Sequence, residues 1–264
     1  MPLITAGIDV GSLTAKAIVF DHEARKVVGR SLVSLTQDPA QAGRLALEEA
    51  LAGAGVREAE LTGTTATGYG RIALPFATYR ITEISCHARG VHHLLPQVRT
   101  VIDVGGQDSK VTRLDDRGRA LDFEMNDRCA AGTGRFLEVM AKALGVDLEG
   151  LAALALASDA PAALSSTCTV FAESEVVGLL AQGRSCEDLA AGLCQSVARR
   201  VVAMVQRLGL EPDVAFTGGV ALNEGVWAAL AQVLGAPITV PPDPQLTGAL
   251  GAALLAAERT AATR

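Results

Sequence analysis

The sequence lacks the features that mark several classes of protein. Its 29 acidic residues outnumber 23 basic ones, for a formal net charge of −6, so it has no general attraction to nucleic acid or anionic lipid. Charged residues, glycine or proline interrupt every apolar run before it could cross a bilayer. The start, MPLITAGIDV, has neither the basic region nor the long apolar stretch of a secretion signal. We therefore expect a cytoplasmic protein with no nucleic-acid or membrane partner.

Cysteine is scarce, and its spacing is irregular. The five cysteines are an odd number, and none stands at a C-x₂-C spacing. A chain of 264 residues, 49% hydrophobic, can bury a core without disulfides, so reduced thiols are expected. Cys186 and Cys194 fall on one predicted helix, about 12 Å apart along its axis at about 1.5 Å per residue, too far to share a metal ion. We expect these two and Cys86 to be structural.

One short segment occurs twice. Residues 8–16 (IDVGSLTAK) and 102–110 (IDVGGQDSK) share the Ile, Asp, Val, Gly and closing Lys. Each copy predicts a buried strand, a tight glycine turn and a second strand. Glycine lets backbone N–H groups surround an anion, and an Asp at the strand end can hold a metal-bound water. Two ordinary hairpin turns are the alternative, which the Asp retained in both copies disfavours.

A third glycine turn follows in residues 213–227 (DVAFTGGVALNEGVW). Here a predicted strand meets Gly218 and Gly219 and then a helix. The apolar positions of that helix are Val220, Leu222, Val226, Trp227 and Leu230. Such a turn can lie against an aromatic base or present a helix N-terminus to phosphate, although it is a weak signal alone.

The coarse layout is two α/β halves that begin with the same hairpin. The expected elements are three strands over 3–34, a helix over 38–53, a strand near 60–66, a helix over 82–95, strands over 100–125, helices over 135–208 and a strand–helix–strand–helix over 213–259. Asp115–Gly118 predicts a hairpin turn. Ser185 with Asp188 predicts the start of the last helix of the 135–208 run, and Gly209 its end.

Seven motifs together carry a family resemblance: residues 7–17, 63–71, 82–90, 101–110, 126–138, 165–176 and 216–223. The paired Asp-Val-Gly hairpins with Phe-Thr-Gly-Gly resemble the acetate and sugar kinase, Hsp70 and actin superfamily of ATPases. The whole set resembles the activator ATPases of 2-hydroxyacyl-CoA dehydratases, which form one family with the ATPase subunits of benzoyl-CoA reductase. The resemblance spans Gly7 to about Ala257. Leu13 departs from the pattern, since the family has a small polar residue there.

The resemblance implies an α/β fold of two actin-like, Hsp70-like lobes, built from duplicated ribonuclease H-like domains with a nucleotide cleft between them. One lobe would comprise residues 1–97 plus a returning helix within 244–264, and the other residues 98–243. The implied function is an ATP-dependent one-electron donor to a separate dehydratase component. A homodimer would hold a single 4Fe–4S cluster between its subunits. ATP with Mg²⁺ drives the transfer, and a ferredoxin or flavodoxin supplies the electron.

The resemblance also assigns residues to the ATP site. The first phosphate loop would be Gly11, Ser12, Leu13 and Thr14, and the second Gly105, Gly106, Gln107 and Asp108. Asp9 and Asp103 would hold Mg²⁺ through water, and Gln107 would orient the attacking water. The turn Gly132, Thr133 and Gly134 would touch phosphate, and Gly218, Gly219 and, more weakly, Asn223 would contact adenosine. Lys16 and Lys110 either neutralise phosphate or pair with nearby carboxylates.

Cys129 and Cys168 are the candidate cluster ligands. Each precedes a predicted helix in a stretch of small residues, where a helix N-terminus stabilises negative charge and a bulky cofactor can approach. A 4Fe–4S cluster takes four thiolates, and two chains related by a twofold axis can supply them. Two inert core cysteines are the alternative.

Other readings remain open at this point. A subunit of a larger acyl-CoA reductase is the nearest rival, and a metabolite kinase of the same fold or an actin-like scaffold is more distant. The acidic run 171–175 (FAESE) is either a solvated helix face or a surface toward the electron partner. His87, His92 and His93 are not expected to form a metal site.

Overall fold

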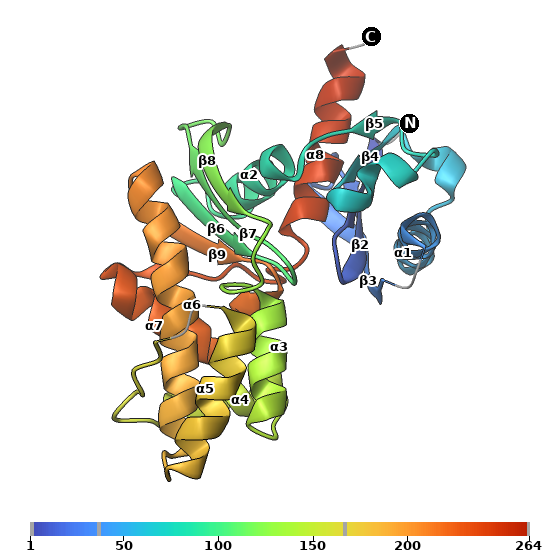
Figure 1. The fold of residues 1–264 in the computed structure, drawn as a ribbon. Coiled ribbons are helices and arrows are strands. Elements are labelled where there is room, and N and C mark those ends of the chain that lie inside the picture. Colours follow the sequence, from blue (N-terminus) through green and yellow to red (C-terminus); the bar gives the residue numbers. More distant parts are fainter. Residues whose placement is uncertain (1–2, 36–37, 166–167, 263–264) are drawn as a thin grey trace. The chain divides into compact units, whose positions relative to one another are not determined.

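The computed structural model describes residues 3–35, 38–165 and 168–262 (Figure 1). Contacts divide the chain into two compact units. Unit 1 comprises Met1–Val98, Leu114–Leu121 and Gln245–Arg264, and unit 2 comprises Arg99–Arg113 and Asp122–Pro244. The division into residues 1–97 with 244–264 and residues 98–243 stays a prediction. Within the described residues no helix is long and apolar enough to cross a membrane.

Unit 1 is built on a five-stranded sheet in the order β3-β2-β1-β4-β5. Its elements are β1 (Ile4–Val10), β2 (Thr14–Asp21), β3 (Lys26–Ser34), α1 (Pro39–Ala54), η1 (Glu58–Glu60), β4 (Gly63–Thr67), η2 (Tyr69–Ala73), β5 (Tyr79–Arg80), α2 (Glu83–Leu94) and α8 (Thr247–Ala262). The first three strands are antiparallel, and β4 and β5 run parallel to β1.

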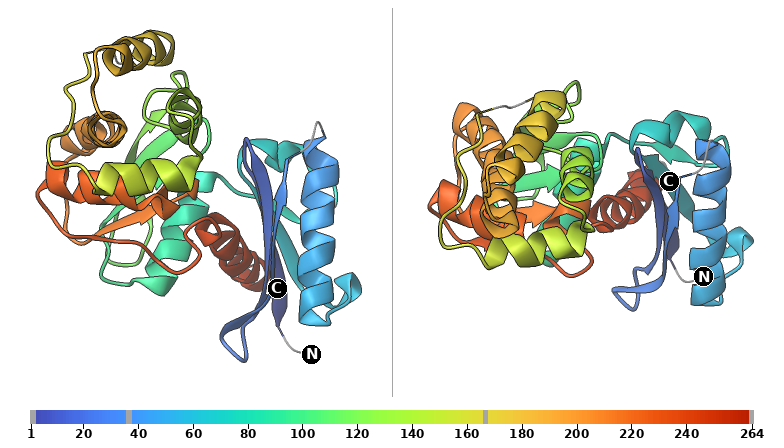
Figure 2. Two further views of the ribbon diagram at one scale, coloured as in Figure 1. Left: turned by 90° about the horizontal axis from the view of Figure 1, so that it is seen from below. Right: turned by 60° about the horizontal axis from the view of Figure 1, so that its bottom comes forward.

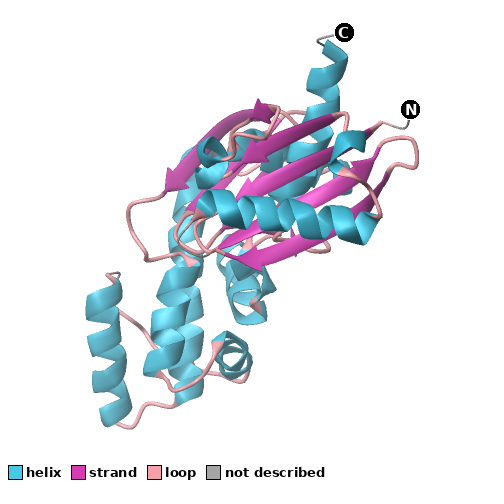
Figure 3. Cartoon of the chain, turned by 90° about the vertical axis from the view of Figure 1, so that its right-hand side faces the viewer, coloured by secondary structure: helices cyan, strands magenta, loops and turns pink. Residues whose placement is uncertain are grey.

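Helices cover both faces of this sheet (Figure 2). Helix α1 lies across one face, where Ile8 and Val10 of β1 pack with Leu47 in one buried cluster (Figure 3). Helix α8 covers the other face, where Ile18 and Phe20 pack with its apolar residues. Helix α2 packs against α8. A side chain on Gly7 would overlap the Ala249 carbonyl oxygen, so α8 is in backbone contact with β1.

Unit 2 repeats the sheet, in the order β10-β9-β6-β7-β8. Its elements are β6 (Thr100–Val104), β7 (Ser109–Leu114), β8 (Ala120–Asn126), α3 (Gly134–Ala143), α4 (Leu148–Leu156), α5 (Thr169–Ala181), α6 (Cys186–Leu208), β9 (Val214–Thr217), η3 (Gly219–Leu222), α7 (Glu224–Leu234) and β10 (Ile238–Thr239). Residues Leu114–Leu121, at the tip of the β7–β8 hairpin, are counted with unit 1.

The two sheets have matching topology. In each, the first strand pairs antiparallel with the second and parallel with the fourth. The halves differ after the third strand: β3 leads directly to α1, whereas α3, α4 and α5 intervene between β8 and α6. These extra helices, gathered below the sheet in Figure 1, share a buried core with α6.

Most predicted elements are confirmed. Ser185 accepts a hydrogen bond from the Asp188 N–H (3.1 Å) at the start of α6, and Gly209 ends that helix. The Gly118 N–H donates to the Asp115 carbonyl (3.1 Å) in the predicted hairpin turn.

The helix expected directly after Gly219 is wrong. The segment from Gly219 to Leu222 is a 3₁₀ helix, and α7 starts only at Glu224. The extended backbone of Asn223 separates the two, and its side-chain oxygen caps α7 by accepting the Val226 N–H (3.0 Å).

Candidate functional site

The two copies of the repeated segment form the same turn. In unit 1 the Gly11 N–H donates to the Thr14 carbonyl (3.0 Å), and in unit 2 the Gly105 N–H donates to the Asp108 carbonyl (2.9 Å). Each turn joins the two strands of an antiparallel hairpin. The predicted strand–turn–strand unit is therefore confirmed in both copies.

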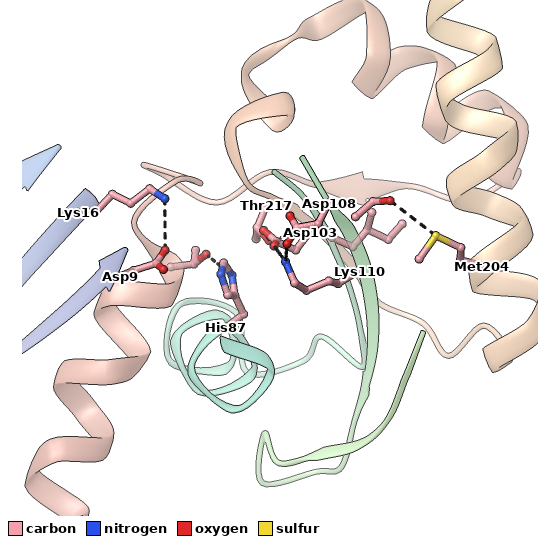
Figure 4. Close-up of polar contacts among 11 residues, drawn as sticks. Asp9, Lys16, His87, Asp103, Asp108, Lys110, Met204 and Thr217 are labelled. Carbon is pink, nitrogen blue, oxygen red and sulfur yellow. Dashed lines mark hydrogen bonds and ion pairs between the residues drawn. The ribbon is translucent and has the colours of Figure 1, made fainter. Parts of the chain in front are cut away.

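The strand register explains the repeated Asp and Lys. Asp9 is opposite Lys16, and Asp103 is opposite Lys110, at the same place in each hairpin. Residues directly opposite on neighbouring strands share a face of the sheet, so their side chains meet. Of the two roles left open for these lysines, the structure shows pairing with nearby carboxylates (Figure 4).

In unit 1, Lys16 Nζ lies 3.4 Å from Asp9 Oδ2. Asp9 is 5% exposed, and it is the last residue but one of the fully buried strand β1. An ionised carboxylate at this depth is stabilised by its cationic neighbour. A metal ion that reaches the turn can replace Lys16 as the partner of Asp9, and a phosphate can replace Asp9 as the partner of Lys16.

In unit 2 the equivalent carboxylate has more partners. Lys110 Nζ lies 2.5 Å from Asp108 Oδ2 and 3.7 Å from Asp103 Oδ2. The Thr217 hydroxyl donates to Asp103 Oδ1 (3.0 Å). All four side chains are buried (Figure 4). The result is a fixed network of two carboxylates and one cation beside the second turn.

The tips of both turns are accessible. Leu13 and Gln107 occupy equivalent positions, and both are exposed. Ser12, Thr14 and Gly106 are partly exposed. The Leu13 carbonyl accepts the Leu35 N–H (2.8 Å), which ties the first turn to the end of β3. The amides and side chains at these tips can thus meet a ligand from solvent.

A second duplicated turn was missed from the sequence. Strand β4 ends at Thr67 and is followed by Gly68, as β9 ends at Thr217 and is followed by Gly218. Asp9 pairs with Thr67 and Asp103 with Thr217. Both glycines have positive φ, 80° and 86°. A side chain on Gly68 would overlap the Asp9 carboxylate, and one on Gly218 would lie 2.9 Å from Asp103 Oδ1. The shared Thr-Gly after a buried strand was the signal.

Asn223 has a structural role in the described residues. Besides capping α7, its side-chain nitrogen donates to the Leu148 carbonyl (3.0 Å), and the residue is buried. Gly219 is the first residue of η3, which ends just before Asn223. Both ends of the Asn223 amide are therefore engaged by the protein itself.

The turn before α3 contacts the second phosphate-loop candidate directly. The Gly134 N–H donates to the Gly105 carbonyl (2.9 Å), and the Arg135 N–H donates to the Gly106 carbonyl (2.8 Å). Thr133 and Gly132 are buried immediately before them. The structure thus brings the start of α3, at Gly134 and Arg135, against Gly105 and Gly106.

Cys129 lies just upstream of that turn. The Asn126 side-chain nitrogen donates to the Cys129 carbonyl (2.9 Å) and also lies 3.3 Å from the Ala131 carbonyl. Thr133 closes the same loop by donating to the Ala130 carbonyl (2.6 Å). The thiol is partly exposed. A hydrogen-bonded loop therefore connects Cys129 to the glycine turn.

Cys168 is the N-cap residue of α5, and it is exposed. Helix α5 packs against α3. Ser166 and Thr167 of the same motif lie outside the described residues. Both candidate ligands thus lie in the segment that unit 2 has between β8 and α6. Among the described residues, there is no group of three or more His, Cys, Asp or Glu side chains that could hold a metal ion.

The other three cysteines lie outside the segment between β8 and α6. Cys86 and Cys194 are buried, and burial raises the pKa of each thiol to about 12. Such thiols stay protonated at neutral pH and pack as small apolar groups. Cys186 is the first residue of α6 and is partly exposed.

The acidic run on α5 is only partly a solvated face. Glu173 is exposed, but Glu175 Oε1 accepts hydrogen bonds from the Ser165 N–H (2.9 Å) and hydroxyl (2.8 Å). Glu175 therefore ties the loop before Cys168 to α5.

Comparison with known proteins identifies relatives of this chain. The model of the BadF/BadG/BcrA/BcrD ATPase family matches residues 6–256. The activator of lactoyl-CoA dehydratase from Anaerotignum propionicum is 48% identical over 97% of this chain and 98% of its own. The (R)-2-hydroxyglutaryl-CoA dehydratase activating ATPase from Acidaminococcus fermentans is 46% identical over 99% of this chain and all of its own (100%).

A solved structure has a similar fold. The activator of the 2-hydroxyisocaproyl-CoA dehydratase from Clostridium difficile with bound ADPNP has a TM-score of 0.92 and 43% identity, and the match covers 99% of this chain and 97% of that one. The predicted α/β ATPase fold is confirmed. The duplicated turns and the match over nearly the whole chain lead to one conclusion: the chain belongs to the BadF/BadG/BcrA/BcrD ATPase family.

Proposed function

We propose that the chain is the ATP-hydrolysing activator of a 2-hydroxyacyl-CoA dehydratase, to which it donates one electron. The single observation that carries this proposal is the hydrogen-bonded connection from the Gly105–Gly106 loop to the Cys129 loop. It links a nucleotide-type turn to a candidate redox ligand. The relatives described above are named as dehydratase activators, which supports the same function.

The nucleotide roles follow from the two turns. The loops Gly11–Thr14 and Gly105–Asp108 bind phosphate through their backbone amides. The Gly11 and Gly105 amides are not among these, because they donate within the turns. Asp9 and Asp103 hold water molecules of Mg²⁺, which supplies charge neutralisation when bound. Gln107 orients the attacking water from its exposed position. Gly218 and Gly219 lie against adenosine.

The two candidate thiols fit a shared 4Fe–4S cluster, which would supply a one-electron carrier. Cys168 is exposed at the N-terminus of a 13-residue helix, and Cys129 is partly exposed in a loop of small residues. A cluster needs four thiolates, and this segment offers two per chain. A second copy of the chain, related by a twofold axis, supplies the other two.

The surface of α5 supports a homodimer at this place. Val170 and Phe171, which follow Cys168, are 68% and 67% exposed, and Val177 is exposed one to two turns further on. Neighbouring exposed apolar side chains on one helix are typical of a protein interface. A ferredoxin or flavodoxin is the proposed electron source.

The same connection suggests how ATP acts. Movement of the Gly105–Gly106 loop on hydrolysis displaces the first turn of α3 through the Gly134 and Arg135 hydrogen bonds. The Cys129 loop is bonded to that turn and moves with it. We propose that this changes the angle between the helices that face the cluster and exposes the cluster to the dehydratase.

The test is iron and sulfide analysis of protein purified without oxygen. We expect about four irons per dimer in the wild-type protein, and loss of iron in Cys129→Ala and in Cys168→Ala. Cys186→Ala is the matched control, since this thiol is also partly exposed but lies at the start of α6. It should keep its iron.

Two outcomes would contradict the proposal. If the wild-type protein binds ATP but is colourless, the chain holds no cluster. Equal iron content in all three variants would remove Cys129 and Cys168 as its ligands.

A further inference from the structure

We propose that Thr217 is a positioning residue: its hydroxyl fixes the orientation of the Asp103 carboxylate, which the equivalent threonine of unit 1 does not do for Asp9. This inference rests on the proposed ATPase function, in which Asp103 holds water molecules of Mg²⁺. Thr217 is the last residue of β9, directly before the turn that we assign to adenosine. Its side chain, however, contacts Asp103.

The hydrogen bond between the two side chains is direct. Thr217 Oγ1 lies 3.0 Å from Asp103 Oδ1 and 3.3 Å from the Ile102 carbonyl oxygen. A hydroxyl has one proton to donate, and an ionised carboxylate is the stronger acceptor. If the proton were on the carbonyl side, an oxygen lone pair would face the negative carboxylate at the shorter distance. The hydroxyl therefore donates to Asp103 (Figure 4).

The backbone holds both side chains in place. Thr217 and Asp103 are 0% and 6% exposed, and they are opposite each other on the paired strands β9 and β6. Directly after Thr217, the Gly218 N–H donates to the Pro244 carbonyl (3.0 Å). A β-branched side chain also has a restricted choice of rotamers. The hydroxyl thus meets Asp103 from one fixed direction.

The nearby lysine does not set this orientation. Lys110 Nζ lies 2.5 Å from Asp108 Oδ2 but 3.7 Å from Asp103 Oδ2, which is beyond ordinary hydrogen-bond length. At that distance the ammonium acts on Asp103 through its charge, which behaves as a compact point charge. A hydroxyl donor at 3.0 Å is directional. Thr217 therefore fixes which oxygen of Asp103 faces β9 and which faces Lys110.

The equivalent threonine of unit 1 makes no such bond. Thr67 is opposite Asp9, as Thr217 is opposite Asp103. The buried Thr67 hydroxyl has no hydrogen bond to Asp9. The neighbour of Asp9 is Lys16, at 3.4 Å. Of these two repeated carboxylates, Asp103 is therefore the one that a neighbouring threonine holds in a fixed orientation.

A fixed carboxylate matters for Mg²⁺ in particular. This ion requires nearly ideal octahedral geometry and keeps several of its water molecules. A carboxylate that accepts from such a water must present its oxygen in the right direction. Groups that hydrogen-bond to metal-binding side chains provide this orientation, and their loss weakens metal binding or activity.

The test removes the hydroxyl and keeps the shape of the side chain. Calorimetry measures the affinity for ADP with Mg²⁺ and with EDTA. We expect Thr217→Val to weaken Mg²⁺-ADP binding about tenfold, the lower end for groups that orient a metal-binding side chain, and to leave the affinity for metal-free ADP unchanged. The Mg²⁺ concentration for half-maximal ATP hydrolysis should rise by the same factor. Thr217→Ser keeps the hydroxyl and should stay near wild type in every readout.

The duplication offers a matched control. Thr67→Val makes the same change at the equivalent position, where the hydroxyl does not bond to Asp9. It should leave both affinities near wild type. Thr217→Ala adds a second pair, because alanine and serine at this position differ by the hydroxyl alone. It should weaken Mg²⁺-ADP binding as Thr217→Val does.

Four results would overturn the positioning role. They are wild-type Mg²⁺-ADP affinity in Thr217→Val, an equal loss in Thr217→Ser, an equal loss in Thr67→Val, and a parallel loss of affinity for metal-free ADP. Failure of both Thr217→Val and Thr217→Ala to fold would show a structural role and would overturn it as well. A wild-type protein that binds Mg²⁺-ADP but does not hydrolyse ATP would overturn the proposed function, while the two ADP affinities would still decide on Thr217.

Discussion

Units 1 and 2 use the same scaffold for different work. Both place an Asp and a Lys opposite each other beside a glycine turn, and both have a Thr-Gly turn next to that Asp. Unit 2 alone has α3, α4 and α5 between its third strand and the following helix, and this segment contains Cys129 and Cys168.

The difference shows where a duplicated fold can diverge. Turns at the ends of buried strands are constrained by register and close backbone contact, so they stay alike. The connection after the third strand is free to lengthen, because sheet pairing does not depend on it. We infer that nucleotide binding uses what the halves share, and electron transfer uses what unit 2 has in addition.

The largest expected effect tests the shared turns. Gly68→Ala and Gly218→Ala each force a side chain into a positive-φ position against backbone oxygen. The backbone conformation alone costs about 1–3 kcal/mol of unfolding free energy, and the overlap adds to it. Urea unfolding should show a similar loss in both variants.

Gly53→Ala is the control for that pair. Gly53 is in α1 with open space around its Cβ position, so alanine should leave stability unchanged or raise it by up to about 1 kcal/mol. A loss in only one of Gly68→Ala and Gly218→Ala would break the equivalence of the two turns.

The next largest effect compares the exposed residues at the tips of the two phosphate-loop candidates. Gln107→Ala should lower kcat for ATP hydrolysis at least about tenfold, equivalent to about 1.4 kcal/mol of transition-state stabilisation, with nearly unchanged ATP affinity. Leu13→Ala changes the equivalent exposed position and should leave kcat near wild type. Unchanged turnover in Gln107→Ala would remove this residue from the reaction.

The smallest effect concerns acid stability of unit 1, which contains all four histidines of the chain. Burial lowers the pKa of His22 and of His93 below the ordinary value of 6.5, and Phe20 packs against both rings. The folded state therefore favours their neutral forms. Their contribution to stability is present above pH 6.5 and is lost as pH falls below it.

Thermal unfolding at pH 7.5 and pH 5.5 measures this contribution. The melting temperature should fall with pH less in the double variant His22→Gln, His93→Gln than in the wild-type protein. An identical fall in both would show that other groups control the acid sensitivity.

Much of the scaffold was predictable because its signals are local. The Asp-Val-Gly repeat predicts both hairpins, and Ser185 and Gly209 predict the ends of α6. The cap that Asn223 forms at the start of α7 was not evident from the sequence, because Val220 and Leu222 fit a continuous helical pattern.

Other features depend on contacts between distant residues. His87 lies 3.1 Å from the hydroxyl of Thr247, 160 positions further along the chain, so nothing near His87 in sequence indicates this contact. That Lys16 and Lys110 pair with carboxylates could be seen only once the strand register was known. The cluster ligands remain a prediction, because a site shared by two chains has only half of its ligands in either one.

The most direct test of the account measures whether nucleotide changes access to the cluster. Cluster-loaded protein is mixed with an iron chelator without oxygen, with and without Mg²⁺-ATP, and the rate of iron removal is followed by absorbance. The account predicts faster removal with Mg²⁺-ATP, because movement of the Gly105–Gly106 loop is transmitted to the Cys129 loop. Equal rates in the two conditions would contradict this coupling.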